Sequence, residues 1–299
     1  MTLVYNPSAG DEQHEGEHLL ERLEDADYDA RLVSGRKKLA RQLEDPGELV
    51  AVAGGDGSVK EVAIALAGRN VPMAILPMGT ANNIAKSLGV MGSMTELIAG
   101  WPEAERRTLR VGSVTAAGGT MPFVESAGVG LFAELVSRGQ AEVDDNTAGL
   151  SGHAIDRALL LLRRITEQRP PILRRITLDG ADLTGEYLAV EAMNIPLLGP
   201  NVPLAPGADC GDDLLDLVLV PERARSAFRD YLSARLGGSG APLELPVRRG
   251  RQVALQASPA EVHVDDDTWK PEGNGSERDV RIELGGDRDR VEVLVPRGD

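Results

Sequence analysis

The sequence has little of what several protein classes require. Its one cysteine, Cys210, excludes an intrachain disulfide and a cysteine-based metal site. Its apolar runs, such as Ala158 to Leu162, are far too short to span a bilayer. Basic residues number 32 against 47 acidic ones, and the net charge of −15 argues against nucleic-acid binding and against electrostatic adhesion to anionic membranes.

The remaining composition is that of a soluble globular protein, with 42% hydrophobic and 26% charged residues. A length of 299 residues exceeds one typical domain, so two domains are expected. Met1 leads directly into the strand-like Leu3-Val4-Tyr5 without a basic segment, and no secretory signal is visible. The sequence therefore favours a cytoplasmic protein.

The most informative stretch is LVAVAGGDGSVKEVAIALAG, residues 49–68. Its apolar start predicts a buried strand, and Ser58 with Glu61 three residues later predicts a capping box at the start of a helix. Gly68 stands where a helix usually ends. A glycine turn between a strand and a helix can bind phosphate, because backbone N–H groups face the anion. Asp56 within that turn predicts a cation, Mg²⁺, beside the phosphates; a tight turn without ligand is the alternative.

Two further turns follow predicted strands in the same way, at residues 6–10 (NPSAG) and residues 77–83 (PMGTANN). Repeated strand, loop and helix predict an open, mostly parallel α/β sheet with ligand-binding loops at one edge. After about Arg106, period-2 alternation predicts a mainly antiparallel β-rich domain. The sequence therefore predicts an α/β nucleotide-binding domain over residues 1–106 and a β-rich domain over residues 107–299.

These motifs resemble the diacylglycerol kinase catalytic-domain family, and more narrowly its bacterial lipid kinases. The likeness is carried by NPSAG, GGDGS, PMGTANNIAKSLG, ESAGVGLFAELV, PGADCGDDLLDLVLV and HVDDDTW, which follow one another in the family's order. The resemblance implies an ATP-dependent lipid kinase that transfers the γ-phosphoryl group to a lipid hydroxyl of diacylglycerol or sphingosine type. ATP and Mg²⁺ are the implied cofactors, and a lipid substrate with transient membrane-surface contact is the implied partner.

The resemblance also implies individual roles. The implied nucleotide contacts are Asn6, Ser34, Gly54, Gly55, Asp56, Gly57, Ser58, Val59, Lys60 and Thr80. Asp56 is the implied carboxylate linked to Mg²⁺, and Asp267 is the implied base that takes the proton from the lipid hydroxyl. Asp209, Asp212 and the backbone of Leu214 are the implied ligands of a structural Mg²⁺, with Ca²⁺ as an alternative; a solvated acidic turn is the other interpretation.

Three features depart from the family pattern, and one of them is Asp213, where the family usually has glycine. The family's Asp-Gly-Glu turn is replaced by three aspartates, Asp265 to Asp267, so the base would have a shorter side chain. Glu272 is an alternative base if the loop is displaced. Acidic Asp11 and Glu12 follow the first turn, where many members have a basic residue.

Two other functions stay open at this point: a kinase of a soluble substrate, similar to NAD kinase, and a non-catalytic nucleotide- or lipid-binding protein. The apolar, proline-rich residues 194–207 either contact lipid or pack beneath the β-rich domain.

Overall fold

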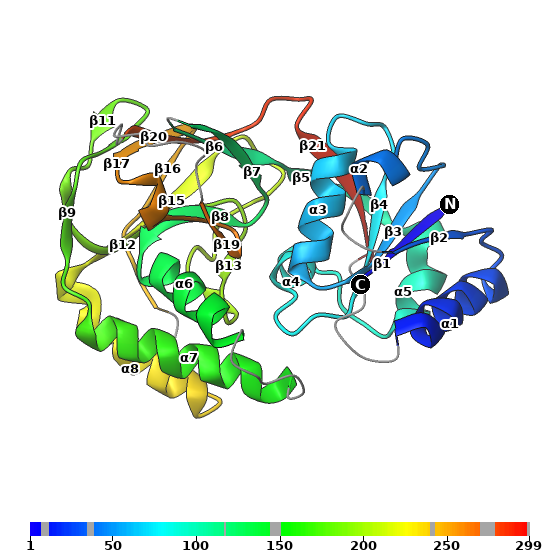
Figure 1. The fold of residues 1–299 in the computed structure, drawn as a ribbon, viewed down its shortest axis with the longest axis horizontal. Helices are drawn as coiled ribbons and strands as arrows, with labels where there is room; N and C mark the ends of the chain where they lie inside the picture. The colour runs from blue at the N-terminus through cyan, green and yellow to red at the C-terminus, as the bar shows by residue number, and fades with distance from the viewer. Residues whose placement is uncertain are drawn as a thin grey trace. The chain divides into compact units, whose positions relative to one another are not determined.

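The computed structural model describes residues 1–6, 12–34, 39–116, 118–143, 151–239, 243–269 and 279–297. The chain forms two compact units, drawn in Figure 1. Unit 1 comprises Met1–Val111 and Gly285–Asp299, and unit 2 comprises Gly112–Leu284. No helix in the described residues is long and apolar enough to cross a membrane.

Unit 1 is an α/β unit built on one six-stranded sheet in the order β2-β1-β3-β4-β21-β5. Its strands are β1 (Thr2–Tyr5), β2 (Arg31–Ser34), β3 (Val50–Gly54), β4 (Met73–Pro77), β5 (Glu105–Arg110) and β21 (Arg290–Val295). Its helices are α1 (Glu12–Asp25), α2 (Leu39–Gln42), α3 (Asp56–Leu66), α4 (Asn83–Leu88) and α5 (Met94–Gly100), followed by a 3₁₀ turn (Trp101–Glu103). All pairs are parallel except that of β21 with β5. The predicted open, mostly parallel sheet is confirmed.

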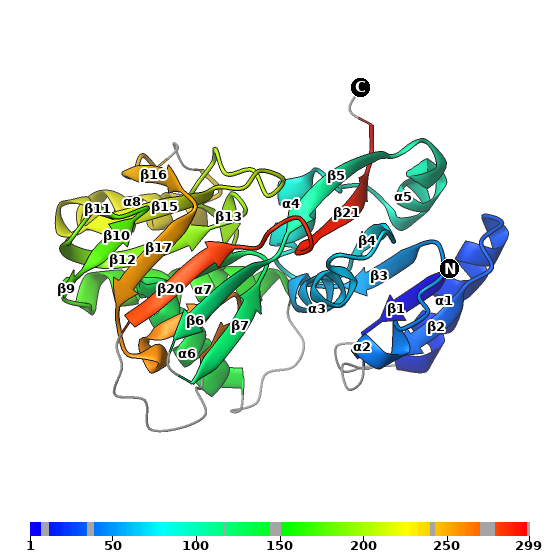
Figure 2. The same ribbon diagram turned by 90° about the horizontal axis from the view of Figure 1, so that it is seen from above.

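The last strand of unit 1 comes from the end of the chain. β21 inserts between β4 and β5, parallel to the first and antiparallel to the second (Figure 2). The predicted division at residue 106 differs from this arrangement, because residues 107–111 and 285–299 belong to unit 1. The run Thr108–Thr115, which alternation predicts as one strand, is divided at Val111 between two sheets. Alternation reports which side of a strand is buried, but it does not report which sheet the strand joins.

Unit 2 contains two mainly antiparallel sheets, as predicted. The first has the order β11-β10-β17-β20-β6-β7, and we call it sheet B; the second has the order β16-β15-β12-β8-β18-β19, with β9 also on β12, and we call it sheet C. Sheet B contains β6 (Gly112–Ala116), β7 (Gly119–Phe123), β10 (Ile176–Leu178), β11 (Ala181–Asp182), β17 (Gln252–Gln256) and β20 (Asp279–Leu284). Sheet C contains β8 (Ser126–Gly130), β9 (Ile172–Arg174), β12 (Gly185–Met193), β15 (Leu215–Pro221), β16 (Val247–Gly250), β18 (Val262–Val264) and β19 (Asp267–Thr268). A small hairpin joins β13 (Leu197–Leu198) to β14 (Val202–Pro203).

Sheet C has an apolar core on each side. One core joins it to sheet B and includes Val190 of β12, Val264 of β18 and Trp269. The other core joins it to the helices α6 (Leu131–Val143), α7 (Ser151–Gln168) and α8 (Arg225–Leu236). Two 3₁₀ turns, Glu222–Ala224 and Pro259–Glu261, complete the unit. Figure 1 shows α7 and α8 side by side along the outer edge of this helical layer.

Candidate functional site

The loops that the sequence predicts to bind a nucleotide lie at one edge of the sheet in unit 1. Tyr5 of β1 pairs with Ser34 of β2 and with Ala53 of β3, and Gly54 pairs with Pro77 of β4. Because these strands are parallel, all four end at the same edge, where ligands of open α/β sheets bind. This edge therefore carries every predicted nucleotide contact. The residues are Asn6, Ser34, Gly54, Gly55, Asp56, Gly57, Ser58, Val59, Lys60 and Thr80.

Two of the loops touch through glycines. A Cβ atom on Gly79 would lie 2.4 Å from the Cα of Gly55, and one on Gly55 would lie 3.1 Å from the Cα of Gly79. The backbone N–H of Met78 also donates to the carbonyl of Gly54 at 2.9 Å. No side chain larger than hydrogen fits this contact, so the loops after β3 and β4 form one continuous backbone surface.

The start of α3 differs from its prediction. The helix begins at Asp56 with Gly55 as its N-cap and without a side-chain cap, so the predicted capping box of Ser58 and Glu61 is wrong. Ser58 lies inside the first turn, and its Oγ accepts a hydrogen bond from Nδ2 of Asn6 at 3.1 Å. That bond ties the loop after β1 to α3. The expected end is confirmed, because Gly68 has the left-handed φ of 75°.

Asp56 connects the two glycine loops a second time. Its Oδ1 accepts a hydrogen bond from the backbone N–H of Ile84 at 2.9 Å, in the first turn of α4. A carboxylate at a helix N-terminus is favoured by the helix dipole. The preceding turn is fixed by Asn82, whose side chain both accepts from Gly79 N at 2.9 Å and donates to Gly79 O at 2.7 Å. Asp56 is thus held at the edge by backbone contacts independent of any ligand.

In unit 2, the three adjacent aspartates form a two-residue β-hairpin turn. Val264 pairs with Asp267, so Asp265 and Asp266 make the turn, and Asp265 has a left-handed φ of 54°. Asp266 and Asp267 are exposed, whereas Asp265 is buried. Asp267, the predicted base, is therefore accessible at the start of β19. We call residues 262–268 the Asp267 hairpin.

Asp265 anchors this hairpin. Its carboxylate accepts hydrogen bonds from three consecutive backbone N–H groups, those of Val124 at 3.1 and 3.2 Å, Glu125 at 2.8 Å and Ser126 at 3.1 Å. Its own N–H donates to the carbonyl of Ser126 at 2.8 Å. A carboxylate that accepts several backbone N–H groups is strongly bound. The sequence gives no local signal for this structural role of Asp265.

His263 of the Asp267 hairpin forms a buried pair with Glu191 of β12. His263 Nε2 lies 2.7 Å from Glu191 Oε2, and both side chains are fully buried. Burial raises the pKa of Glu191, and its pairing with His263 offsets this only in part. Burial by itself lowers the pKa of His263, but the Glu191 carboxylate and Asp265 together raise that pKa above its ordinary value. The sequence signal for this pair is a single charge, Glu191, within the apolar run of β12.

The predicted metal site at the acidic turn is arranged around arginines. Asp209 accepts from the N–H of Gly211 at 3.0 Å, and Asp212 accepts from the N–H of Leu214 at 2.9 Å. Asp212 also pairs with Arg249, whose Nε lies 3.4 Å from Asp216 Oδ2. In the described part of the chain, no three acidic, histidine or cysteine side chains gather as a metal-binding group. The side chains as arranged therefore do not form a metal-binding set, and the metal role of Asp209, Asp212 and Leu214 stays a prediction.

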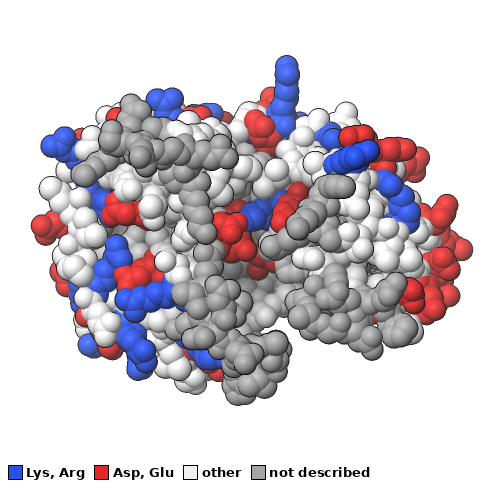
Figure 3. Space-filling view, in the orientation of Figure 1, with Lys and Arg blue, Asp and Glu red and all other residues white. Residues whose placement is uncertain are grey.

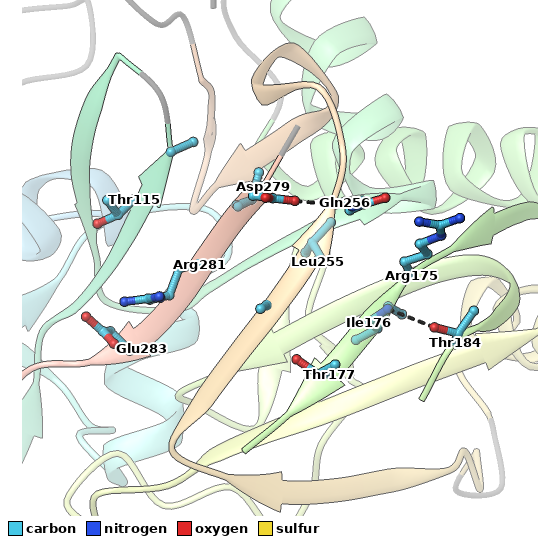
Figure 4. Close-up of a pocket in the computed structure, with 13 residues that line it drawn as sticks. Thr115, Arg175, Ile176, Thr177, Thr184, Leu255, Gln256, Asp279, Arg281 and Glu283 are labelled. Carbon is cyan, nitrogen blue, oxygen red and sulfur yellow. Dashed lines mark hydrogen bonds between the residues drawn. The ribbon is translucent and has the colours of Figure 1, made fainter. Parts of the chain in front are cut away.

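A hollow of about 740 Å³ lies on the face of sheet B that points away from sheet C. Figure 4 shows Arg281 and Glu283 of β20 on this face, with Asp279 hydrogen-bonded to Gln256 at 3.3 Å. None of the predicted site residues lines it. Leu198 and Val202, in the segment considered for lipid contact, pack instead into the core beneath the helices. Residues 7–11 and Glu272 lie outside the described residues.

The chain combines an α/β unit, which has glycine loops at the carboxyl edge of its sheet, with a β unit of two sheets. Residues 1–114 match the family model described as the diacylglycerol kinase catalytic domain. Residues 138–273 match that of the YegS C-terminal NAD kinase beta sandwich-like domain. The first part of the chain is thus similar to the diacylglycerol kinase catalytic domain, and most of the second part is similar to the YegS C-terminal domain.

Individual relatives extend over most of the chain. A diacylglycerol kinase of Mycobacterium tuberculosis (strain H37Rv) is 23% identical over 262 residues, covering 85% of this chain and 80% of the relative. The diacylglycerol kinase of Bacillus subtilis is 25% identical over 252 residues, covering 79% and 78%. The crystal structure of a diacylglycerol kinase from Bacillus anthracis has a TM-score of 0.69 at 21% identity, covers 98% of this chain and 96% of its own, and is similar in fold.

Proposed function

We propose that this protein is an ATP-dependent lipid kinase that transfers the γ-phosphoryl group of ATP to a lipid hydroxyl of diacylglycerol or sphingosine type. The observation that carries the proposal is the match of residues 1–114 to the diacylglycerol kinase catalytic domain, followed by the match of residues 138–273 to the YegS C-terminal domain. The match to this catalytic domain and the kinase names of the relatives support a phosphotransferase with an alcohol acceptor. The relatives named as diacylglycerol kinases support a lipid alcohol as that acceptor.

Unit 1 is proposed to hold the nucleotide. The glycine contact between the loops after β3 and β4 leaves their backbone open to a close approach by phosphates, and the first turn of α3 directs its N–H groups to the same edge. The carboxylate oxygens of Asp56 suit a hard cation such as Mg²⁺, which prefers carboxylate and phosphate oxygens as ligands. When bound, Mg²⁺ would neutralise charge that develops on the phosphates.

Asp267 is proposed to act as the general base. Its carboxylate takes the proton of the lipid hydroxyl while the hydroxyl oxygen forms a bond to the γ-phosphorus. The bond between the γ-phosphorus and the bridging oxygen breaks, and ADP leaves with the electron pair. An exposed carboxylate on a rigid hairpin suits this role, because the base must reach the hydroxyl within hydrogen-bond distance.

A lipid kinase must also meet its substrate at a membrane surface, and we infer a transient contact. Figure 3 shows basic side chains gathered over α7 and α8, on a protein whose net charge is −15. Arg157 and Arg164 of α7 are exposed on either side of Leu160, which is 45% exposed. An apolar side chain between arginines is suited to the anionic surface of a membrane.

A kinase of a soluble substrate is the second candidate. The description of the second family model as NAD kinase beta sandwich-like favours it. A non-catalytic binding protein is the third candidate from the sequence, and a transfer assay separates all three.

The test is a transfer screen with γ-labelled ATP. Mixed micelles of diacylglycerol, micelles of sphingosine and a solution of NAD are each offered to the purified chain with Mg²⁺, and Asp56→Asn serves as the inactive control. Label in one of the two lipids, and none in NAD, is the expected result. Label in NAD alone would replace the proposal with the soluble-substrate kinase, and nucleotide binding without transfer to any acceptor would leave a binding protein.

A further inference from the structure

Glu191 and His263 meet across a strand that separates them. β8 lies between β12 and β18 in sheet C, and Gly128 of β8 pairs with Glu191 on one side and with His263 on the other. A Cβ atom on Gly128 would lie 2.1 Å from Glu191 Oε2. The two side chains can therefore reach one another only because the residue between them is glycine.

The hydrogen bonds of His263 fix where its protons lie. Nδ1 is 3.0 Å from the backbone carbonyl of Asp265, and a carbonyl oxygen can only accept, so Nδ1 carries a proton. Nε2 faces the Glu191 carboxylate at 2.7 Å, and that short contact also requires a proton between the two atoms. Imidazole and carboxylate therefore share one proton and are neutral as a pair, which is how two buried ionisable groups are tolerated.

The same histidine holds the turn of the Asp267 hairpin. The carbonyl that accepts from His263 belongs to Asp265, whose carboxylate is itself bound to the amides of residues 124–126. The turn is therefore fixed at two points, and one of them leads through His263 to Glu191 on a different strand. Asp267 is the first residue after this turn.

We propose that Glu191 and His263 are positioning residues for the reaction, because together they hold the turn that sets the place of Asp267. The inference rests on the proposed function, in which Asp267 is the base. Neither side chain touches substrate, since both are fully buried. A displacement of about 1 Å at a reacting group can cost about 10²-fold in rate. Loosening the pair is therefore expected to reduce kcat and to leave the KM for ATP unchanged.

Three variants separate positioning from packing. Glu191→Leu keeps the approximate size but removes the partner of His263, whereas Glu191→Gln keeps a donor toward Nε2. His263→Gln keeps a donor toward Glu191 but loses the bond to the Asp265 carbonyl, so it breaks only the link to the turn. Leu232→Ala, a buried change in the helical core of the same unit, is the matched control for lost stability.

The expected result is a loss in kcat of about 10- to 10²-fold for Glu191→Leu and His263→Gln. Glu191→Gln and Leu232→Ala are expected to retain kcat within about threefold, measured where circular dichroism shows each variant folded. In an Asp267→Asn background, Glu191→Leu and His263→Gln should add no further loss, because they act through the same group.

The inference is overturned if folded His263→Gln has the parental kcat. It is also overturned if the double variant with Asp267→Asn loses kcat by the product of the two single losses. Should Glu191→Leu fail to fold, His263→Gln decides alone, since it leaves the buried carboxylate with a partner. Failure of the proposed function looks different: Asp267→Asn by itself would then leave kcat unchanged.

Discussion

The glycine loops of unit 1 and the Asp267 hairpin of unit 2 hold a carboxylate in place by opposite means. In unit 1, the neighbours of Asp56 come from short motifs, and its hydrogen-bond partner Ile84 is 28 residues away in sequence. In unit 2, the amides that bind Asp265 are 139 to 141 residues away, and Glu191 is 72 residues from His263. Asp56 is positioned by the backbone of neighbouring loops. Asp265 is positioned by backbone amides that are distant in sequence, and its hairpin is also held by the buried Glu191–His263 pair.

This difference has a consequence for mutation. Local glycine loops depend on the absence of side chains, so changes there should affect ligand contacts first. A buried anchor depends on satisfied hydrogen bonds, so changes there should affect stability first. The comparison therefore predicts that unit 1 variants lose activity while folded, and that unit 2 anchor variants lose stability.

The largest effect is expected for Asp56→Asn. The amide oxygen can still accept from Ile84 N–H, so the fold should persist, but the charge that would couple to Mg²⁺ is lost. We expect a loss of phosphoryl transfer of more than about 10³-fold. Asp56→Ala, which also removes the acceptor for α4, should in addition lower the melting temperature. Near-normal turnover of Asp56→Asn with ordinary Mg²⁺ dependence would contradict the assignment.

The next effect concerns Asp265. Asp265→Ala leaves three backbone N–H groups without their acceptor, and each unsatisfied group costs about 1–3 kcal/mol, so the free energy of unfolding should fall by about 3 kcal/mol or more. Asp266→Ala, at the exposed neighbouring position, should change it by less than about 0.5 kcal/mol. Equal effects of the two variants in urea denaturation would show that Asp265 is no anchor.

A smaller effect concerns pH. The pKa of His263 is raised in the folded state by the Glu191 charge despite burial, so its contribution to stability is complete below the unfolded pKa of about 6.5 and is lost as pH rises through the folded value. The raised pKa of Glu191 acts in the same direction. Besides Glu191, Asp265 also faces His263, and β8 places only Gly128 opposite His263 in the sheet. The charged α6 residues Glu134 and Arg138 pair with each other.

The measurement is the unfolding free energy of the parent and of Glu191→Gln at about pH 6 and about pH 9. The variant replaces the shared proton with an amide hydrogen that does not titrate. The advantage of the parent should therefore shrink as pH rises. A difference that stays constant, or that grows with pH, would contradict the shared proton.

The smallest effect is expected at the acidic turn. Arg249 pairs with both Asp212 and Asp216, so after Asp212→Ala it can still neutralise the buried Asp216. An exposed ion pair of this kind contributes about 0–1 kcal/mol, and the loss of stability should lie in that range. Elemental analysis of the same sample tests the metal prediction: a divalent ion that Asp212→Ala removes, together with a larger loss of stability, would show that a cation rather than arginine neutralises the turn.

The sequence predicted the part of the molecule whose determinants are local. The glycine turn at residues 54–57, the parallel sheet and the edge that carries the predicted contacts follow from motifs a few residues long. The end of α3 just before Gly68 was predictable, but its start was not, because Ser58 bonds to Asn6 in the loop after β1 and does not cap its own helix. Local rules fail where a distant partner competes for the same group.

The sequence could not predict features that require distant pairing. The return of β21 to unit 1 depends on its pairing with β4 and β5, and alternation does not indicate which strands will pair. The three adjacent aspartates do not indicate that one of them, Asp265, is buried and binds backbone amides 139 to 141 residues away. Glu191 is a charge within the apolar part of β12, and only the pairing of β12, β8 and β18 brings it to His263.

The most direct test of the central claim, that the loops hold the nucleotide while the hairpin carries the base, is a comparison of Asp267→Asn with the parent for single-turnover transfer and ATP affinity. A general base typically contributes about 10²–10⁴-fold, so transfer should fall by that factor while ATP affinity stays unchanged. Asp267→Glu, which restores the family residue, should keep or raise the rate, and Glu272→Gln should be neutral. If Glu272→Gln is the inactive variant, or if Asp267→Asn retains the parental rate, the account of the hairpin is wrong.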